Sequence, residues 1–403
     1  MTINNDPPSH IGAQVPRSAF VALGLAAFGS GMSMRVADPM LVRLSSEFSV
    51  SLGTVSAVIT AFSVAYGLAQ LLFGPLGDRY GKYFVIAFGC LFCSVTTLLC
   101  AAASNFSSLL AARLLAGASC AALIPLSMAW IGDVVPYERR QAVLARFMIG
   151  LILGNGVGVL IGGFCADYLD WRIPFWLIAL AFLLTGAYLT YLRRKLPAQA
   201  LAKSGLHGES SLPLWKAFSL VVSVPWARVI LTSVFIEGAL VFGTLAFIPT
   251  ILHLRLGMSL TAAGSVVMLF GLGGLCFAVF SPVLVRRLGE VWLIRGGAIV
   301  MAMSMLTIGY SPSWWLILPA CFLFGLGFYM MHNTLQINAT QMVPERRGAA
   351  VAAFASCFFF GQAIGVAMTG VVLDKTSGTH LSIFLSLAVL LVGLQLAKAC
   401  ARR

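Results

Sequence analysis

Residues 74–83 read Gly74-Pro75-Leu76-Gly77-Asp78-Arg79-Tyr80-Gly81-Lys82-Tyr83 and join two long apolar runs, at about 54–76 and 83–103. Each run is close to the ~20 apolar residues that a helix needs to cross a hydrocarbon core about 30 Å thick. The glycines permit a tight turn between closely packed helix ends. The basic residues Arg79 and Lys82 are typical of a loop on the cytoplasmic side of a membrane. The stretch therefore predicts a hairpin of two membrane spans.

Ten further apolar runs raise the number of predicted spans to twelve. Of the 403 residues, 60% are hydrophobic and only 10% are charged, whereas a soluble domain carries about 25% charged residues. The net charge of +13 lies in the loops rather than on one face of a soluble domain, so nucleic acid is not an expected partner. We predict an all-α membrane protein. The ten further runs fall at about 18–42, 107–131, 143–166, 174–192, 229–252, 262–284, 291–309, 314–337, 349–373 and 379–397, and the twelve runs are numbered as spans 1 to 12 in chain order.

The polar segments predict how the chain is divided and oriented. The first 16 residues contain no short apolar core followed by a cleavage site, so we expect the first apolar run to remain as a span. Most of the 26 Lys and Arg residues fall on the cytoplasmic side if both termini are cytoplasmic, which predicts a multi-pass protein of the cell (inner) membrane. A surface helix is expected at 214–224 in the linker. The predicted organisation is a cytoplasmic tail at 1–16, a six-helix bundle at 17–192, a cytoplasmic linker at 193–227, a second six-helix bundle at 228–398 and a cytoplasmic tail at 399–403.

The two predicted bundles carry an internal repeat with an offset of about 207 residues. The segment Val135-Pro136-Tyr137-Glu138-Arg139-Arg140 returns as Val343-Pro344-Glu345-Arg346-Arg347. Duplicated six-span halves are typical of transporters that bind a substrate between the halves, near the middle of the membrane. The repeat therefore predicts two pseudo-symmetric bundles. Four residues near the ends of spans 5 and 11 repeat as well, namely Gly154, Gly158, Gly163 and Asp167, which recur as Gly361, Gly365, Gly370 and Asp374.

The segment 74–83 resembles the loop signature G-x-L-x-D-R-x-G-[RK]-[RK] of the major facilitator superfamily, with Tyr83 in place of the last basic residue. The resemblance implies the major facilitator fold, with two bundles that move around a central cavity. It also implies a gate, in which Asp78 and Arg79 close the cytoplasmic side against spans 4 and 11, near Ala349. An ordinary basic turn is the alternative. The residues implied in the gate are Gly74, Asp78, Arg79, Gly81, Lys82, Asp133 and Arg140.

Two other stretches carry the same resemblance. Arg113-Leu114-Leu115-Ala116-Gly117 is similar to the R-x-x-Q-G motif of span 4, with Ala116 in place of glutamine. Glycines in span 5 are similar to the antiporter signature G-x-x-x-G-P-x-x-G-G, with Val159 in place of proline, and the twelve-span drug/proton antiporter branch is the nearest group. Pure packing without any meaning for the direction of transport is the alternative. The glycines predicted to form a groove for another helix are Gly150, Gly154, Gly158, Gly162 and Gly163.

Only two of the 13 acidic residues, Asp38 and Glu237, lie within predicted spans. Asp38 is expected to pair with Arg35, one helical turn before it, or with Arg113 at a similar depth, and we predict that these three residues take part in proton coupling. Glu237 has no Lys or Arg at its expected depth. A carboxyl group buried away from cations can take up or release a proton as its hydration changes, so Glu237 is the predicted proton carrier. A protonated Glu237 that only bonds a neighbouring helix is the alternative.

The end of span 10 is unusually polar for a helix that faces lipid. His332 and Gln336 lie four residues apart and so share one face. They can bind a substrate or join neighbouring helices, and both roles remain open. His332 also lies near the expected depth of Glu237 and is the predicted modulator of its proton. The candidate substrate-binding residues are Tyr329, His332, Asn333 and Gln336.

The sequence contains no motif of an enzyme and no phosphate-binding loop, so we expect neither catalysis nor a cofactor. Its nine cysteines are scattered, and no metal site is predicted. The leading hypothesis is a secondary transporter that works as a monomer by alternating access and exports a small organic compound in exchange for protons. Uptake or facilitated transport of a sugar or another metabolite is one alternative. A membrane sensor or scaffold without transport is another.

Overall fold

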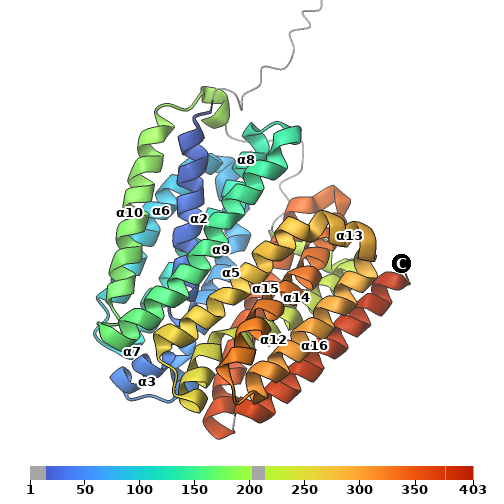
Figure 1. The fold of residues 1–403 in the computed structure, drawn as a ribbon. Coiled ribbons are helices and arrows are strands. Elements are labelled where there is room, and N and C mark those ends of the chain that lie inside the picture. The colour runs from blue at the N-terminus through green and yellow to red at the C-terminus, as the bar shows by residue number, and fades with distance from the viewer. Residues whose placement is uncertain (1–14, 202–213, 377, 403) are drawn as a thin grey trace, which may run out of the picture.

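The computed structural model describes residues 15–201, 214–376 and 378–402, and every regular element among them is helical (Figure 1). The predicted tail at 1–16 and the centre of the predicted linker lie largely outside the described residues. A helix, α11, lies at Leu214–Ser223, where the sequence predicts one. The helices of the first half are α2 (Arg17–Arg35), η1 (Asp38–Met40), α3 (Leu41–Phe48), α4 (Leu52–Val55), α5 (Ala57–Tyr80), α6 (Lys82–Ala101), α7 (Phe106–Cys120), α8 (Leu123–Val134), α9 (Tyr137–Tyr168) and α10 (Ile173–Arg193), followed by η2 (Ala198–Leu201).

The second half begins after α11, and one of its elements consists of two helices joined at a kink. Among the described residues, eleven spans are long and apolar enough to cross a membrane. One of them, α13, has 51 residues, and its backbone breaks at Gly289, where φ is 70° and ψ is 172°. α13 therefore supplies two crossings, and the described residues supply the twelve that the sequence predicts. The helices are α12 (Pro225–Leu256), α13 (Leu260–Tyr310), α14 (Trp314–Gln341), η3 (Pro344–Arg346), α15 (Arg347–Lys375) and α16 (Gly378–Ala401).

Two predicted spans are interrupted in the structure. Span 1 leaves the α-helical form after Arg35 and continues through η1, which contains Pro39. Span 4 is divided into α7 and α8 just before Pro125. Proline has no backbone N–H to donate, and its ring clashes with the carbonyl four residues earlier, so a helix tends to break there. Both interruptions lie inside the protein, where non-helical backbone can be tolerated in a membrane.

The sequence repeat corresponds to a repeat in packing. Gly154 of α9 lies against the backbone of Phe28 in α2, and Gly361 of α15 lies against the backbone of Phe235 in α12. Both members of the second pair follow their counterparts by 207 residues, since 361 minus 154 and 235 minus 28 give the same offset. A β-carbon at either glycine would strike a backbone carbonyl, so the glycines allow the helices to approach closely.

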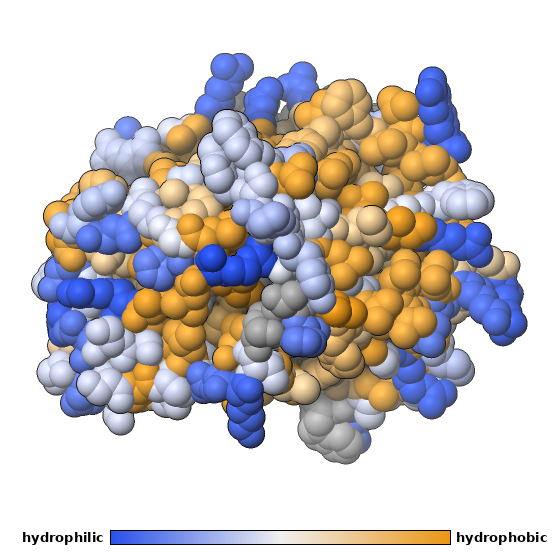
Figure 2. All heavy atoms as spheres, turned by 60° about the horizontal axis from the view of Figure 1, so that its bottom comes forward, coloured by the Kyte–Doolittle hydropathy of each residue, from blue (hydrophilic) through white to orange (hydrophobic). Residues whose placement is uncertain are grey.

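The outer surface is suited to lipid. Large hydrophobic side chains are exposed on helices of both halves, including Phe88, Val279 and Phe384. Figure 2 shows broad areas of hydrophobic side chains, interrupted by groups of hydrophilic ones. Soluble monomers rarely expose contiguous apolar surface on this scale. The chain is therefore a multi-span membrane protein.

The two halves contact each other mainly through α5 with α15 and α9 with α13. Among the described residues, the hydrogen bonds between α4 or α5 and α15 involve residues 51–67 of the first half and 356–374 of the second. The hydrogen bonds between α9 and α13 join Asp167 to Leu260 and Thr261. The name 'closed end' is used for the end of the molecule where α9 and α15 terminate. At the opposite end, called the open end, α8 and the second half diverge (Figure 1).

Candidate functional site

A buried ion pair stands where α2 ends in the first half. Arg35 is the last residue of α2, and Asp38 opens the 3-10 helix η1 that Pro39 favours. The Arg35 Nη1 atom lies 3.0 Å from Asp38 Oδ2, and the two side chains are only 3% and 0% exposed. The pairing predicted from their spacing of three residues is present. It compensates two charges that would otherwise be costly inside a membrane protein.

Arg113 lies near this pair but is held mainly by backbone carbonyl groups. Its Nε donates to the carbonyl of Val58 at 3.2 Å, and its Nη1 donates to that of Ser33 at 2.9 Å. The guanidinium also lies over the ring of Phe62, 4.3 Å from its centroid. The Arg113 side chain is fully buried and does not extend to the molecular surface. Its contacts tie α7 to α2 and α5.

A second buried pair stands in the other half. Glu237 of α12 is 0% exposed, and its Oε2 atom lies 2.7 Å from Nδ1 of His332 in α14. The other carboxyl oxygen, Oε1, has no hydrogen-bond partner among the described residues. The sequence places these two residues at a similar depth, and the structure joins them directly. The pair links two helices of the second half through one strong bond.

Aromatic rings surround His332 and connect the two buried pairs. His332 stacks on Phe328, with ring centroids 4.9 Å apart, and its ring centroid lies 5.0 Å from that of Phe358. Phe242 contacts both of these rings at 5.6 and 5.2 Å. The guanidinium of Arg35 lies over Phe242, 5.1 Å from its centroid. A continuous set of rings therefore runs from Arg35 in the first half to His332 in the second.

A small cavity of about 50 Å³ lies where the two halves meet, beside this set of rings. Its lining includes Arg35, Asn155 and Met268, together with Phe242 and Tyr329. Of the candidate substrate residues, Tyr329 lines this cavity, whereas His332, Asn333 and Gln336 do not. Gln336 is exposed and Asn333 is half-buried. Asn155 is not among the predicted site residues, although it is a lone amide among the glycines of span 5 and its polarity within a span could have indicated it.

A larger hollow of about 1180 Å³ lies toward the open end of the first half, between α2, α8 and α9. Arg17, Arg139 and Arg146 line it together with apolar residues. It contains none of the residues predicted to couple protons or bind substrate. Of the predicted residues, Arg35 and Tyr329 line the smaller cavity instead.

The predicted gating loop lies at the open end. Lys82 pairs with Asp133 of α8 at 2.6 Å, and Gly81 has the positive φ of 95° that a tight turn between α5 and α6 requires. Asp78 is exposed and makes no hydrogen bond or ion pair with any residue that the structure describes. Arg79 lies over the ring of Tyr80. Among the residues that the structure describes, no hydrogen bond or ion pair joins Asp78 or Arg79 to α15.

Two other residues of the predicted gate, Arg140 and Gly74, make no hydrogen bond to the second half among the described residues. Arg140 donates to the carbonyl of Val135 at 3.4 Å, within the segment that joins α8 to α9. Gly74 is exposed and touches no side chain at the position of a β-carbon.

The predicted glycine groove of α9 faces α2. A β-carbon at each of its first four glycines would meet the backbone of α2 or of the residue that follows it. Gly163 differs, because it lies against Leu260 and Thr261 of the other half. The groove therefore packs α9 inside the first half, and its last member brings α9 close to α13. The four that face α2 are Gly150, Gly154, Gly158 and Gly162.

Comparison with known proteins gives a consistent result. The sequence profile of the Major Facilitator Superfamily matches residues 23–397. YwfA of Bacillus subtilis, described as an uncharacterized MFS-type transporter, is 25% identical over 351 residues that cover 87% of this chain and 84% of YwfA. Citrate exporter 1 of Aspergillus niger is 30% identical over 176 residues that cover 43% of this chain and 34% of the exporter. The inward-facing, occupied structure of a bacterial homolog of the human lysosomal transporter Spinster gives a TM-score of 0.73 at 16% identity and covers 96% of both chains.

Proposed function

Because this chain belongs to the Major Facilitator Superfamily and is therefore a membrane transporter, we propose that it exports a small organic compound in exchange for protons. Membership of the family establishes transport, whereas export and proton coupling are proposed. The proposal places the transporter in the cell (inner) membrane with both termini cytoplasmic, working as a monomer. The positive-inside rule supports this orientation, because the basic loops then face the cytoplasm.

The buried pair of Glu237 and His332 is the observation that carries proton coupling. Glu237 is fully buried, bonds one titratable partner at 2.7 Å and leaves its other oxygen free of any described partner. Protonation of the carboxylate removes its charge and weakens the bond that holds α12 to α14. A change in the hydration of this site between conformations therefore changes how readily it holds a proton. That link between proton and conformation is what a coupled transporter needs.

The Arg35 and Asp38 pair has a different role in this proposal. Asp38 already forms a buried ion pair with a guanidinium at 3.0 Å. Arg35 and Tyr329 line the cavity at which the two halves meet. We assign this region to the substrate, with its rings offering apolar contacts and its polar groups fixing orientation. Arrival of substrate or proton would bias the two halves toward one of their two arrangements.

Export is supported by one relative and by the sequence pattern of α9. The citrate exporter is a relative over part of the chain, and its name concerns that protein alone. The glycines of α9 follow most of an antiporter signature. Import of a sugar or another metabolite, and a scaffold without transport, are separated from export by experiment.

A compound panel separates these alternatives directly. Cells with and without the protein are compared for growth inhibition by each compound, and compounds that respond are then tested in reconstituted vesicles with an imposed pH gradient. Export predicts that the protein protects cells, and that the gradient drives the compound uphill. Sensitisation of cells would indicate uptake. If no compound is transported in vesicles that contain the protein and hold the pH gradient, the hypothesis of a scaffold without transport is favoured.

A further inference from the structure

At the closed end, an aspartate of the first half binds the beginning of a helix in the second. Asp167 stands one residue before the end of α9. Its Oδ1 accepts a hydrogen bond from the backbone N–H of Leu260 at 3.0 Å, and its Oδ2 accepts from the backbone N–H of Thr261 at 2.7 Å. The Thr261 hydroxyl donates to the same Oδ2 at 2.6 Å. These N–H groups open α13 and have no partner within that helix.

An aspartate of the second half makes the corresponding contact in the opposite direction. Asp374 stands one residue before the end of α15. Both of its carboxylate oxygens lie 3.1 Å from the backbone nitrogen of Gly53 in α4, and its Oδ2 accepts from the Ser51 hydroxyl at 2.6 Å. α4 leads through Ser56 into α5. The carboxylate of each half therefore binds the start of a span in the other half.

The two contacts are related by the internal repeat. Asp374 minus Asp167 gives an offset of 207, and Leu260 minus Gly53 gives the same value. A glycine stands four residues before each aspartate, and both glycines lie against the opposing half, Gly163 against Leu260 and Gly370 against Gly53. The donor, the acceptor and the close approach are thus all repeated. A chance surface contact would not be expected to recur at the same offset in both halves.

We propose that Asp167 and Asp374 form a symmetric latch that holds the closed end shut, and that both contacts must break before the transporter can open at this end. Each contact is a charge-assisted set of hydrogen bonds, which is stronger than a set between neutral groups. When this end opens, the two carboxylates and the backbone N–H groups at the two helix N-termini must form hydrogen bonds with water instead. The latch therefore adds to the stability of one conformation and sets how often the other is reached. The inference rests on alternating access within the proposed function, and on neither proton coupling nor the direction of transport.

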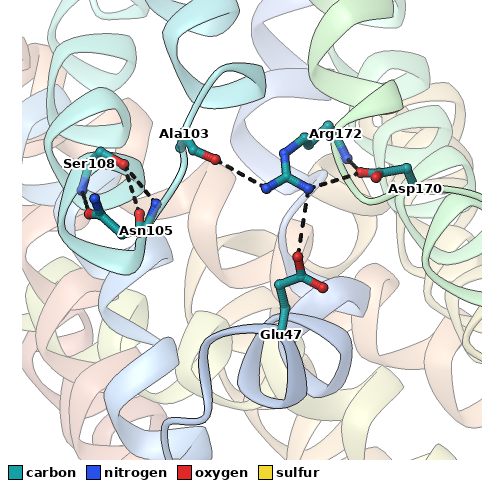
Figure 3. A network of polar contacts seen from close by, with 6 residues as sticks. All are labelled: Glu47, Ala103, Asn105, Ser108, Asp170 and Arg172. Carbon is teal, nitrogen blue, oxygen red and sulfur yellow. Dashed lines mark hydrogen bonds and ion pairs between the residues drawn. The ribbon is translucent and has the colours of Figure 1, made fainter.

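A neighbouring charge network supplies a matched control. Asp170 lies three residues after Asp167 at the same end, but it binds Arg172 of its own half, with a backbone hydrogen bond of 2.8 Å. Arg172 also reaches Glu47 of α3 at 3.6 Å and the carbonyl of Ala103 at 3.2 Å. Figure 3 shows that this network joins segments of the first half only. Asp170→Asn removes the same charge from the same end without touching a contact between the halves.

Distances between spin labels across the closed end test the proposal. Labels are placed on cysteines introduced at Ser46 of α3 and Leu254 of α12, which are exposed and belong to different halves. The three half-buried native cysteines, Cys276, Cys357 and Cys400, are replaced by serine, and the other six are buried. The full chain is measured in lipid nanodiscs at fixed pH without substrate. The measurement therefore does not depend on the transported compound or on the coupling ion.

The latch predicts a graded result. Asp167→Asn and Asp374→Asn each add a population with a longer distance, and the double variant raises the ratio of long to short distances at least about tenfold over the parent. Asp170→Asn leaves the distribution of the parent unchanged. Asp167→Glu, which keeps the charge, restores part of the short population and provides a second reading if the neutral variants fold poorly. A double variant with the distribution of the parent and of Asp170→Asn overturns the proposal.

Discussion

Each of the two buried carboxyl groups has one close polar partner, and the kind of partner sets what the group can do. Asp38 faces a guanidinium, which stays charged at any physiological pH, at 3.0 Å. Glu237 faces an imidazole, which can itself gain or lose a proton, at 2.7 Å. The first pair is suited to a lasting charge, and the second to a charge that changes. This difference is why Glu237, and not Asp38, is proposed as the proton carrier.

Removal of the Asp38 charge tests the structural half of this division. Asp38→Asn leaves the buried Arg35 guanidinium without its carboxylate, and loss of one partner of a buried pair costs about 3–5 kcal/mol. We expect a lower midpoint of thermal unfolding in detergent and weaker substrate binding. The double variant Arg35→Gln with Asp38→Asn removes both charges and should recover part of the loss. If Asp38→Asn unfolds at the midpoint of the parent, the pair contributes nothing to stability.

Some of the site could be predicted from the sequence, and the rest depends on how the halves meet. Arg35 and Asp38 are three residues apart, so their contact follows from helical geometry alone. Glu237 and His332 could be placed at one depth, but only the fold brings them into contact. Asn155 reaches the cavity only because α9 packs against α13, and no local pattern encodes that contact.

At the scale of the helices, glycines determine how closely α2 and α9 approach. A β-carbon at Gly154 would strike the Phe28 carbonyl, whereas one at Gly132 of α8 would meet nothing within 4 Å. Gly154→Ala should therefore destabilise the first half by about 1–3 kcal/mol through overpacking. Gly132→Ala should be neutral or slightly stabilising, because alanine favours a helix by about 1 kcal/mol over glycine. Thermal unfolding of the two variants side by side measures the difference, and equal midpoints would contradict the packing role.

The loop between α5 and α6 should act in the opposite sense to the closed end. In this conformation Asp78 makes no hydrogen bond or ion pair with a described residue. We therefore expect Asp78→Asn to leave the stability of this conformation unchanged. If Asp78 forms its contact only after the open end has closed, the substitution disfavours that state, and transport slows. The labels at Ser46 and Leu254 should then show fewer long distances, while the latch variants show more. A rise in long distances, or unchanged transport, would remove Asp78 from the gate.

The interruptions of the helices show what a pattern of hydrophobicity can and cannot predict. The twelve apolar runs could be read from length and composition, because the membrane demands about 20 apolar residues in each span. The division of α13 into two crossings could be predicted as well, because its break at Gly289 falls between the predicted runs at 262–284 and 291–309. The latch aspartates were visible as a repeat, but their partners lie 93 and 321 residues away along the chain.

At the scale of the whole molecule, the carboxylates at the two ends differ in their contacts. Asp167 and Asp374 bind across the halves at the closed end, whereas Asp78 at the open end makes no hydrogen bond or ion pair with a described residue. The buried pairs lie between these ends, where Arg35 of the first half lies over Phe242 of the second. We propose that movement of the halves changes the surroundings of Glu237 and His332 through this set of rings. We propose that this change couples a proton to the transport of a small molecule.

Flux driven by a pH gradient, in vesicles that hold either the parent or Glu237→Gln, tests this account most directly. Glutamine matches the protonated carboxyl in size and charge and cannot exchange a proton, so the parent should concentrate its compound when the gradient is imposed and Glu237→Gln should not. Both proteins should bind the compound, and both should exchange it down its own gradient. Concentration of the compound by Glu237→Gln at the rate of the parent would contradict the account and return the coupling role to Asp38.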